Sequence, residues 1–209
     1  RTMEAQRRPL YLAAADAVGE ISKICGGRPA LLAETGAVQP NHSGPWRHYA
    51  SDKDGIIFHD AFYVPFFAGA AGSGQPWHWD VYIYNHKLWR HLKPFAALVK
   101  GVNPAVENFK PARCDTKNAR VYALSGEKTL LAFARNVEND WKSEFEKGQK
   151  PREISGETVD FSAFAKGRKI ARVRAYDLWD GGNASDLALS PKAELPAFKR
   201  SCAVRIDFE

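Results

Sequence analysis

The hydrophobic pattern divides the chain near residue 105. Before that point, segments with a helical period alternate with short, continuously apolar runs. After it, short β-rich runs such as 119–124, 129–134, 169–176 and 202–208 recur between turns that contain Gly, Asn and Asp. The first pattern is typical of α/β structure and the second of antiparallel strands. The sequence therefore predicts an α/β domain over residues 1–104 and an all-β domain over residues 105–209.

The first part begins with a predicted helix over Leu10–Cys25, which Gly26-Gly27 ends as a C-cap. The run Pro29–Ala33 follows, and its continuous apolar character suits a parallel strand buried on both faces. A helix with Pro65 inside it and a last helix starting at Asn85 and ending near Gly101–Pro104 complete the pattern. We expect Pro29–Glu34 and Gln75–Trp79 to be adjacent parallel strands joined by a right-handed helical crossover.

Glu34 stands at the exit of the first predicted strand, in Glu34-Thr35-Gly36. An ionised carboxylate beside apolar packing needs partners or a chemical purpose. Parallel barrels carry their chemistry at the C-terminal ends of their strands. Glu34 is therefore a candidate catalytic residue, and a salt-bridged structural carboxylate is the alternative.

An aromatic segment, Trp77-His78-Trp79-Asp80-Val81-Tyr82, follows the second predicted strand. Aromatic faces stack on sugar rings, and carboxylates cleave glycosidic bonds. The candidate sugar-binding residues are Trp77, Trp79, Asp80 and Tyr82, together with His42 in the loop after Glu34. Because side chains alternate along a strand, His78 is expected to point outward while both tryptophans point inward. The tryptophans could instead fill the core, Asp80 could cap a turn, and His42 could lie plainly on the surface.

At these residues the chain resembles the cellulase-like, family-five-type glycoside hydrolases. The resemblance covers roughly residues 10–105 and rests on the order of Glu34-Thr35-Gly36, Ala68–Gly72, Trp77–Tyr82 and Phe95–Gly101. It implies the last two strands of a (β/α)₈ barrel with their helices, Glu34 as the nucleophile of a retaining mechanism, and a carbohydrate substrate. Members of this family more often have three consecutive tryptophans where His78 interrupts the pair here.

A complete barrel needs roughly 250 residues, and only about the first hundred here have barrel character. We therefore expect a fragment that lacks the acid/base carboxyl group, which the family takes from its fourth strand. Its open strand edges would need a missing barrel segment or another chain to cover them. The resemblance also implies a secreted or periplasmic location.

Residues 105–209 predict an antiparallel β-sandwich. Tyr176–Gly182 and the closing strand resemble the C-terminal β domain that accompanies such barrels, which is sometimes labelled a collagen-binding domain. The cysteines Cys25, Cys114 and Cys202 form no full disulfide set, although Cys114 and Cys202 could pair if the first and last strands were neighbours.

The composition indicates an ordinary globular protein, with 44% hydrophobic and 26% charged residues. No apolar stretch reaches the roughly 18 residues that span a bilayer. The net charge of +6 is scattered among acids, which argues against a nucleic-acid partner. No cysteine and histidine spacing predicts a metal site, and no cofactor is expected.

Two further functions compete with the hydrolase. A non-catalytic carbohydrate-binding or structural module would keep the aromatic surface without the carboxylate pair. An adhesin-like partner binder would act through an exposed aromatic patch on the predicted sandwich.

Overall fold

The computed structural model describes residues 8–39 and 43–209, and its helices and strands form two compact units. The first unit comprises the chain up to Arg90 together with Asp140–Lys150, and the second comprises His91–Asn139 with Pro151–Glu209. This division differs from the predicted boundary at residue 104, because the segment 140–150 returns to the first unit and the last helix belongs to the second.

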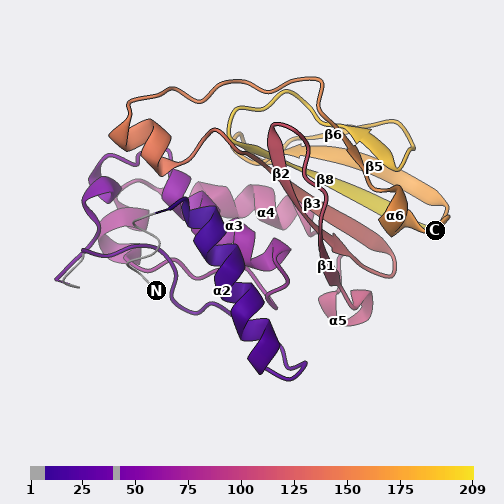
Figure 1. Cartoon of the computed structure of the whole chain (residues 1–209), viewed down its shortest axis with the longest axis horizontal. Coiled ribbons are helices and arrows are strands. Elements are labelled where there is room, and N and C mark those ends of the chain that lie inside the picture. The colour runs from indigo at the N-terminus through magenta and orange to yellow at the C-terminus, as the bar shows by residue number, and fades with distance from the viewer. Residues whose placement is uncertain (1–7, 40–42) are drawn as a thin grey trace. The chain divides into compact units, whose positions relative to one another are not determined.

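The first unit is mainly helical (Figure 1). Its elements are α2 (Leu10–Ile24), η1 (Arg47–Ala50), α3 (Ile56–Phe67), the π-helical turns η2 (Trp79–Tyr84) and η4 (Lys142–Glu146), and most of η3 (Leu88–His91). Helix α2 packs against α3, which is buried along its whole length. Left-handed Gly26 and Gly27 follow α2 and confirm the predicted C-cap.

The predicted barrel strands are not present among the described residues of this unit. One isolated parallel bridge joins Thr35 to Pro76, with α3 lying between them in the chain. The expected parallel pairing is therefore confirmed at this point, but it does not extend into strands. The run Pro29–Ala33 is exposed or half-buried, and Leu31 is 55% exposed. A strand buried on both faces needs packed layers above and below it, and the exposure of this run shows that it lacks them.

The predicted helix from Asn85 is also broken. Lys87 adopts a positive φ of 54°, which interrupts helical geometry between η2 and η3. The regular helix is α4 (Leu92–Leu98), and it ends three residues before Gly101.

The second unit is built on a six-stranded sheet in the order β1-β2-β3-β8-β5-β6, with every neighbouring pair antiparallel. Figure 1 shows the C-terminal strand β8, in yellow, between β3 and β5. The strands are β1 (Lys110–Arg113), β2 (Ala119–Ser125), β3 (Thr129–Asn136), β5 (Ile170–Asp177), β6 (Ala184–Asp186) and β8 (Ser201–Phe208). Short helices α5 (Pro104–Glu107) and α6 (Ser162–Ala165) complete this unit. The prediction of antiparallel β structure without long helices after residue 114 is confirmed.

One face of the sheet carries the main hydrophobic core. Alternate residues of its central strands, including Val121, Ala132, Val173 and Val204, are buried in one cluster. A two-stranded ribbon of β4 (Thr158–Asp160) and β7 (Lys192–Glu194) contributes Val159 and Ala193 to the same cluster. The observed arrangement is a six-stranded sheet with a two-stranded ribbon, so the predicted antiparallel β-sandwich is not confirmed. Cys25, Cys114 and Cys202 are all free thiols.

Candidate functional site

Glu34 is exposed. The backbone of its neighbour Thr35 is hydrogen-bonded to the segment that carries Trp77. The Thr35 amide donates to the Gln75 carbonyl at 3.0 Å, and the Trp77 amide donates to the Thr35 carbonyl at 2.8 Å. The Gln75 amide also donates to the Leu32 carbonyl at 3.0 Å. These bonds fix the backbone around Glu34 to the segment that carries Trp77.

Close packing against α3 positions this segment. Pro65 has no backbone N–H, so the Ala61 carbonyl loses its usual helical donor. A Cβ at Gly74 would stand 2.0 Å from that carbonyl oxygen, and the Gly74 amide donates to Phe62 O at 3.0 Å. Only glycine permits this approach.

The two tryptophans are exposed, and the histidine between them is half-buried. Trp77 is 49% and Trp79 66% exposed, whereas the Nε2 atom of His78 is buried. The expected inward tryptophans and outward histidine are therefore wrong. The physical reason is that His78 adopts a left-handed conformation with φ of 60°, which abolishes the alternation of a strand and starts η2.

Tyr49 connects the loop after Glu34 to this turn. Its hydroxyl accepts from the Ala37 amide at 2.7 Å, and a Cβ at Gly36 would stand 2.6 Å from it. The Tyr49 ring stacks on Tyr82 with 4.0 Å between centroids and meets the His78 ring edge-on at 5.6 Å. Burial raises the pKa of Tyr49, so its hydroxyl stays neutral.

Tyr82 is a core residue of this turn. It is 1% exposed, and its hydroxyl donates to Asp52 at 2.6 Å and accepts from the Phe58 amide at 3.0 Å. The prediction that Tyr82 contacts sugar is therefore wrong, because no surface of its ring is open to a ligand. Asp80 is exposed in the first turn of η2. His42 lies outside the described residues.

Two buried polar atoms near the pairing have no hydrogen-bond partner among the described residues. They are Thr35 Oγ1 and His78 Nε2. Burial lowers the pKa of His78, although the nearby Asp80 carboxylate opposes this effect. Unsatisfied buried groups and a left-handed non-glycine residue both cost free energy, and such features concentrate at functional sites.

His48 and Trp141 pack against other aromatic rings of the first unit. His48 stacks on Phe145 at 5.7 Å, and burial together with the neighbouring Arg47 lowers its pKa. Trp141 is 1% exposed and meets Trp46 edge-on at 4.5 Å, so it is a packing residue of the first unit. Trp89, in contrast, is 46% exposed.

Tyr49 and Asp52 are the residues of this site that the sequence interpretation missed. Tyr49 ends the aromatic loop segment Trp46–Tyr49 and Asp52 follows it, and the number of rings in this segment was the available signal. No group of three or more His, Cys, Asp or Glu side chains in the described part of the chain is arranged to hold a metal ion. None of the described helices is long and apolar enough to cross a membrane.

Comparison with known proteins gives one structural neighbour. No family model matches the chain, and no curated protein matches it. The chain is similar to a solved structure described as a GH30 endoxylanase from Clostridium papyrosolvens C71, with 10% identity and a TM-score of 0.39. The match covers 88% of this chain and 43% of that chain, so this chain spans less than half the length of the neighbour.

Proposed function

We propose that this chain acts on carbohydrate as the part of a retaining O-glycosyl hydrolase that carries the nucleophile and an aromatic sugar platform. The observation that supports the proposal is the bridge between Thr35 and Pro76. It brings an exposed carboxylate, Glu34, to the same stretch of backbone as exposed Trp77. The resemblance of these residues to cellulase-like hydrolases gives the roles.

In this proposal Glu34 attacks the anomeric carbon of the bound sugar. The bond from that carbon to the leaving oxygen breaks, and a second carboxyl group roughly 5 Å away donates a proton to this oxygen. The second group then removes a proton from water, which displaces Glu34 and regenerates its carboxylate. Trp77 and Trp79 hold the sugar ring by stacking while the bonds change.

The turn between the tryptophans sets their orientation. His78 starts η2 in a left-handed conformation and contacts Tyr49, whose hydroxyl binds the backbone of the loop after Glu34. Tyr82 and Asp52 hold the other end of the turn to α3. The exposed platform is thus supported by a buried polar and aromatic layer, as a precise binding surface requires.

The test is sugar binding by the 209-residue chain. Binding is measured as quenching of tryptophan fluorescence during titration with cellotetraose, xylotetraose and mannotetraose. The double variant Trp77→Ala, Trp79→Ala should weaken binding at least about tenfold, because stacking contributes about 1–3 kcal/mol. Trp89→Ala is the matched control, since it also removes an exposed indole. Unchanged affinity in the double variant would refute the proposed platform. Binding that depends on both tryptophans but never leads to hydrolysis or glycosylation of Glu34 would favour the non-catalytic binding module.

A further inference from the structure

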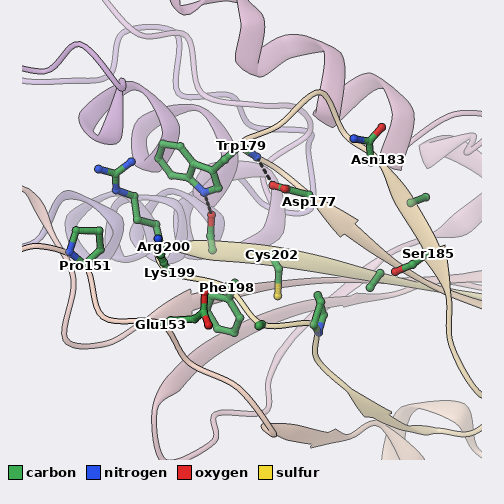
Figure 2. A pocket seen from close by; sticks show the side chains of 15 residues that line it. Pro151, Glu153, Asp177, Trp179, Asn183, Ser185, Phe198, Lys199, Arg200 and Cys202 are labelled. Carbon is green, nitrogen blue, oxygen red and sulfur yellow. Dashed lines mark hydrogen bonds between the residues drawn. The ribbon is translucent and has the colours of Figure 1, made fainter.

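The second unit has a cleft of its own at one end of the sheet. Its volume is about 680 Å³, within the usual range of small-ligand sites. Figure 2 shows its walls, which come from the ends of β5 and β8, from β6, from the turn after β5 and from the segments 151–153 and 196–200. All of these residues belong to the second unit.

The rim of the cleft is held in place by hydrogen bonds. Asp177 Oδ1 accepts from the amides of Trp179 and Asp180 at 2.8 and 3.2 Å, and Trp179 Nε1 donates to Ser201 Oγ at 2.8 Å. The guanidinium of Arg200 lies 4.9 Å from the centroid of the Trp179 ring. The indole and the turn that carries it are therefore fixed before any ligand arrives, which reduces the entropic cost of binding.

The floor is apolar and chemically inert. Phe198, Ala175 and Cys202 line it, and all three are buried. Burial raises the pKa of the Cys202 thiol, so it stays protonated and does not act as a nucleophile. The floor therefore offers an apolar contact surface and no reactive group.

The polar lining carries balanced charge. Glu153 and Asp177 are opposed by Lys199 and Arg200, while Asn183 and Ser185 add neutral polar groups. A cleft with no net charge gives no electrostatic preference for an ionic ligand. Polar groups that ring an apolar floor match a ligand with many hydroxyls and an apolar ring face, because each hydroxyl needs a partner once it leaves water.

From this lining we propose that the cleft between β5, β6 and the segment 196–200 is a second binding site, and that its ligand is a neutral oligosaccharide. This site is separate from Glu34 and the two tryptophans, and it does not depend on the hydrolase proposal. It would give the chain a second point of contact with a bound polysaccharide.

The test is a nuclear magnetic resonance titration of the ¹⁵N-labelled 209-residue chain with cellotetraose, xylotetraose and mannotetraose. At least one should shift the Trp179 indole N–H and the Ser185 amide with a dissociation constant in the millimolar range or tighter. Ser185→Trp should weaken this binding at least tenfold, because Ser185 is exposed on β6 and a bulky ring there fills the cleft. Ala188→Trp is the matched control on an exposed residue outside the lining, and it should leave the affinity unchanged.

The proposal would be overturned by no shift of these two signals with any of the three sugars, by a Trp179 indole shift that persists in Ser185→Trp, or by tighter binding in the cleft of a charged probe, spermine or tripolyphosphate. The same titration of Trp77→Ala, Trp79→Ala separates the two sites. Unchanged shifts at Trp179 in that variant support an independent cleft, whereas their loss would assign the binding to the first unit and contradict the second site. A failure of the tryptophan platform with an intact cleft would count only against the hydrolase proposal.

Discussion

The Tyr82 hydroxyl donates a 2.6 Å hydrogen bond to Oδ2 of Asp52, and both side chains are buried. Asp52 also accepts from the amides of Gly55, Ile56 and Ile57 at 2.8 Å each, and so it satisfies the donors at the start of α3. The Asp52 side chain is therefore hydrogen-bonded both to the turn η2 and to the beginning of the buried helix α3.

Tyr82→Phe tests the contribution of the hydrogen bond between Tyr82 and Asp52 to stability. The hydroxyl that bridges Asp52 and the Phe58 amide is lost, while the stacking on Tyr49 remains. The free energy of unfolding should fall by about 1–3 kcal/mol, because the buried Asp52 carboxyl group and the buried Phe58 amide each lose a partner. Urea denaturation followed by tryptophan fluorescence measures the change. Tyr84→Phe, at a site 69% exposed, is the control and should have little effect. Equal stability of both variants would contradict a structural role for the pair.

Gly74→Ala should destabilise the first unit. Its new Cβ would overlap the Ala61 carbonyl, a rigid backbone atom, so the segment leading to Trp77 must move away from α3. The expected loss is about 1–3 kcal/mol in thermal or urea denaturation, together with weaker sugar binding. Gly19→Ala within α2 has open space around its Cβ and should instead stabilise the chain by about 1 kcal/mol. Full stability of Gly74→Ala would mean that this close approach does not hold the segment.

Helical periodicity and glycine caps were sufficient to predict α2 and its end, and strand periodicity was sufficient for the antiparallel half of the chain. Parallel pairing of Pro29–Glu34 with Gln75–Trp79 was predicted from the order of apolar runs, and the structure has one isolated parallel bridge, between Thr35 and Pro76, in place of the two strands. These features depend on local pattern, which the sequence displays directly.

The orientation of the candidate site could not be predicted in the same way. His78 at φ 60° reverses which rings face solvent, and no local pattern signals a left-handed histidine. The contact between Trp46 and Trp141 joins residues far apart in the chain, which explains why the return of segment 140–150 to the first unit was missed. Asp52 satisfies the amides at the start of α3 and also binds Tyr82, a residue 30 positions away that no local pattern links to it.

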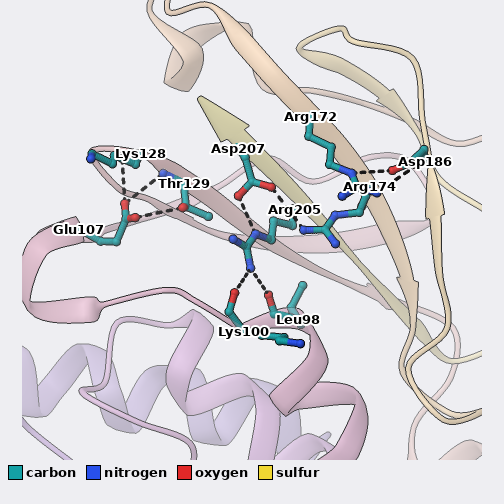
Figure 3. Close-up of polar contacts among 10 residues, drawn as sticks. All are labelled: Leu98, Lys100, Glu107, Lys128, Thr129, Arg172, Arg174, Asp186, Arg205 and Asp207. Atoms are coloured by element: carbon teal, nitrogen blue, oxygen red, sulfur yellow. Dashed lines mark hydrogen bonds and ion pairs between the residues drawn. The ribbon is translucent and has the colours of Figure 1, made fainter. Parts of the chain in front are cut away.

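Arg205 anchors β8 to the end of α4 in the second unit. Figure 3 shows its guanidinium between Asp207, which accepts at 2.7 Å, and the carbonyls of Leu98 and Lys100, which accept at 3.0 and 2.7 Å. Arg205→Met should lower the free energy of unfolding by about 3 kcal/mol, because it leaves a partly buried carboxylate and two carbonyls without this partner. Arg172→Met is the control, since its bonds to Asp186 lie in solvent and should contribute little. Equal effects of the two variants in urea denaturation would contradict the anchor.

The stability of the first unit should fall as the pH drops below about 6.5, the ordinary pKa of histidine. The folded pKa values of His48 and His78 are lowered, so the unfolded chain binds more protons in this window and acid favours unfolding. Arg47 and Glu146 lie against His48, and Asp80 and Tyr49 lie against His78. His78→Asn should flatten the slope of unfolding free energy between pH 7.5 and 5.5, since asparagine tolerates the left-handed backbone and does not titrate. The same slope in the variant would rule out a contribution from His78.

The role of Glu34 can be tested on the chain alone, without the second carboxyl group. A 2-deoxy-2-fluoroglycosyl fluoride has a leaving group that needs no protonation, so a positioned nucleophile should displace it and form a covalent ester. Incubation with the glucosyl, xylosyl and mannosyl fluorides should add one fluorosugar to the intact mass for at least one of them, and peptide mapping should locate it on Glu34. Glu34→Gln should abolish the labelling, whereas Glu20→Gln, at an exposed position on α2, should retain it. In a hydrolytically active protein that contains this chain, Glu34→Gln should abolish turnover and leave sugar binding largely intact. Labelling of a different carboxylate, or turnover at an undiminished rate with Gln at position 34, would refute the assignment of Glu34 as the nucleophile.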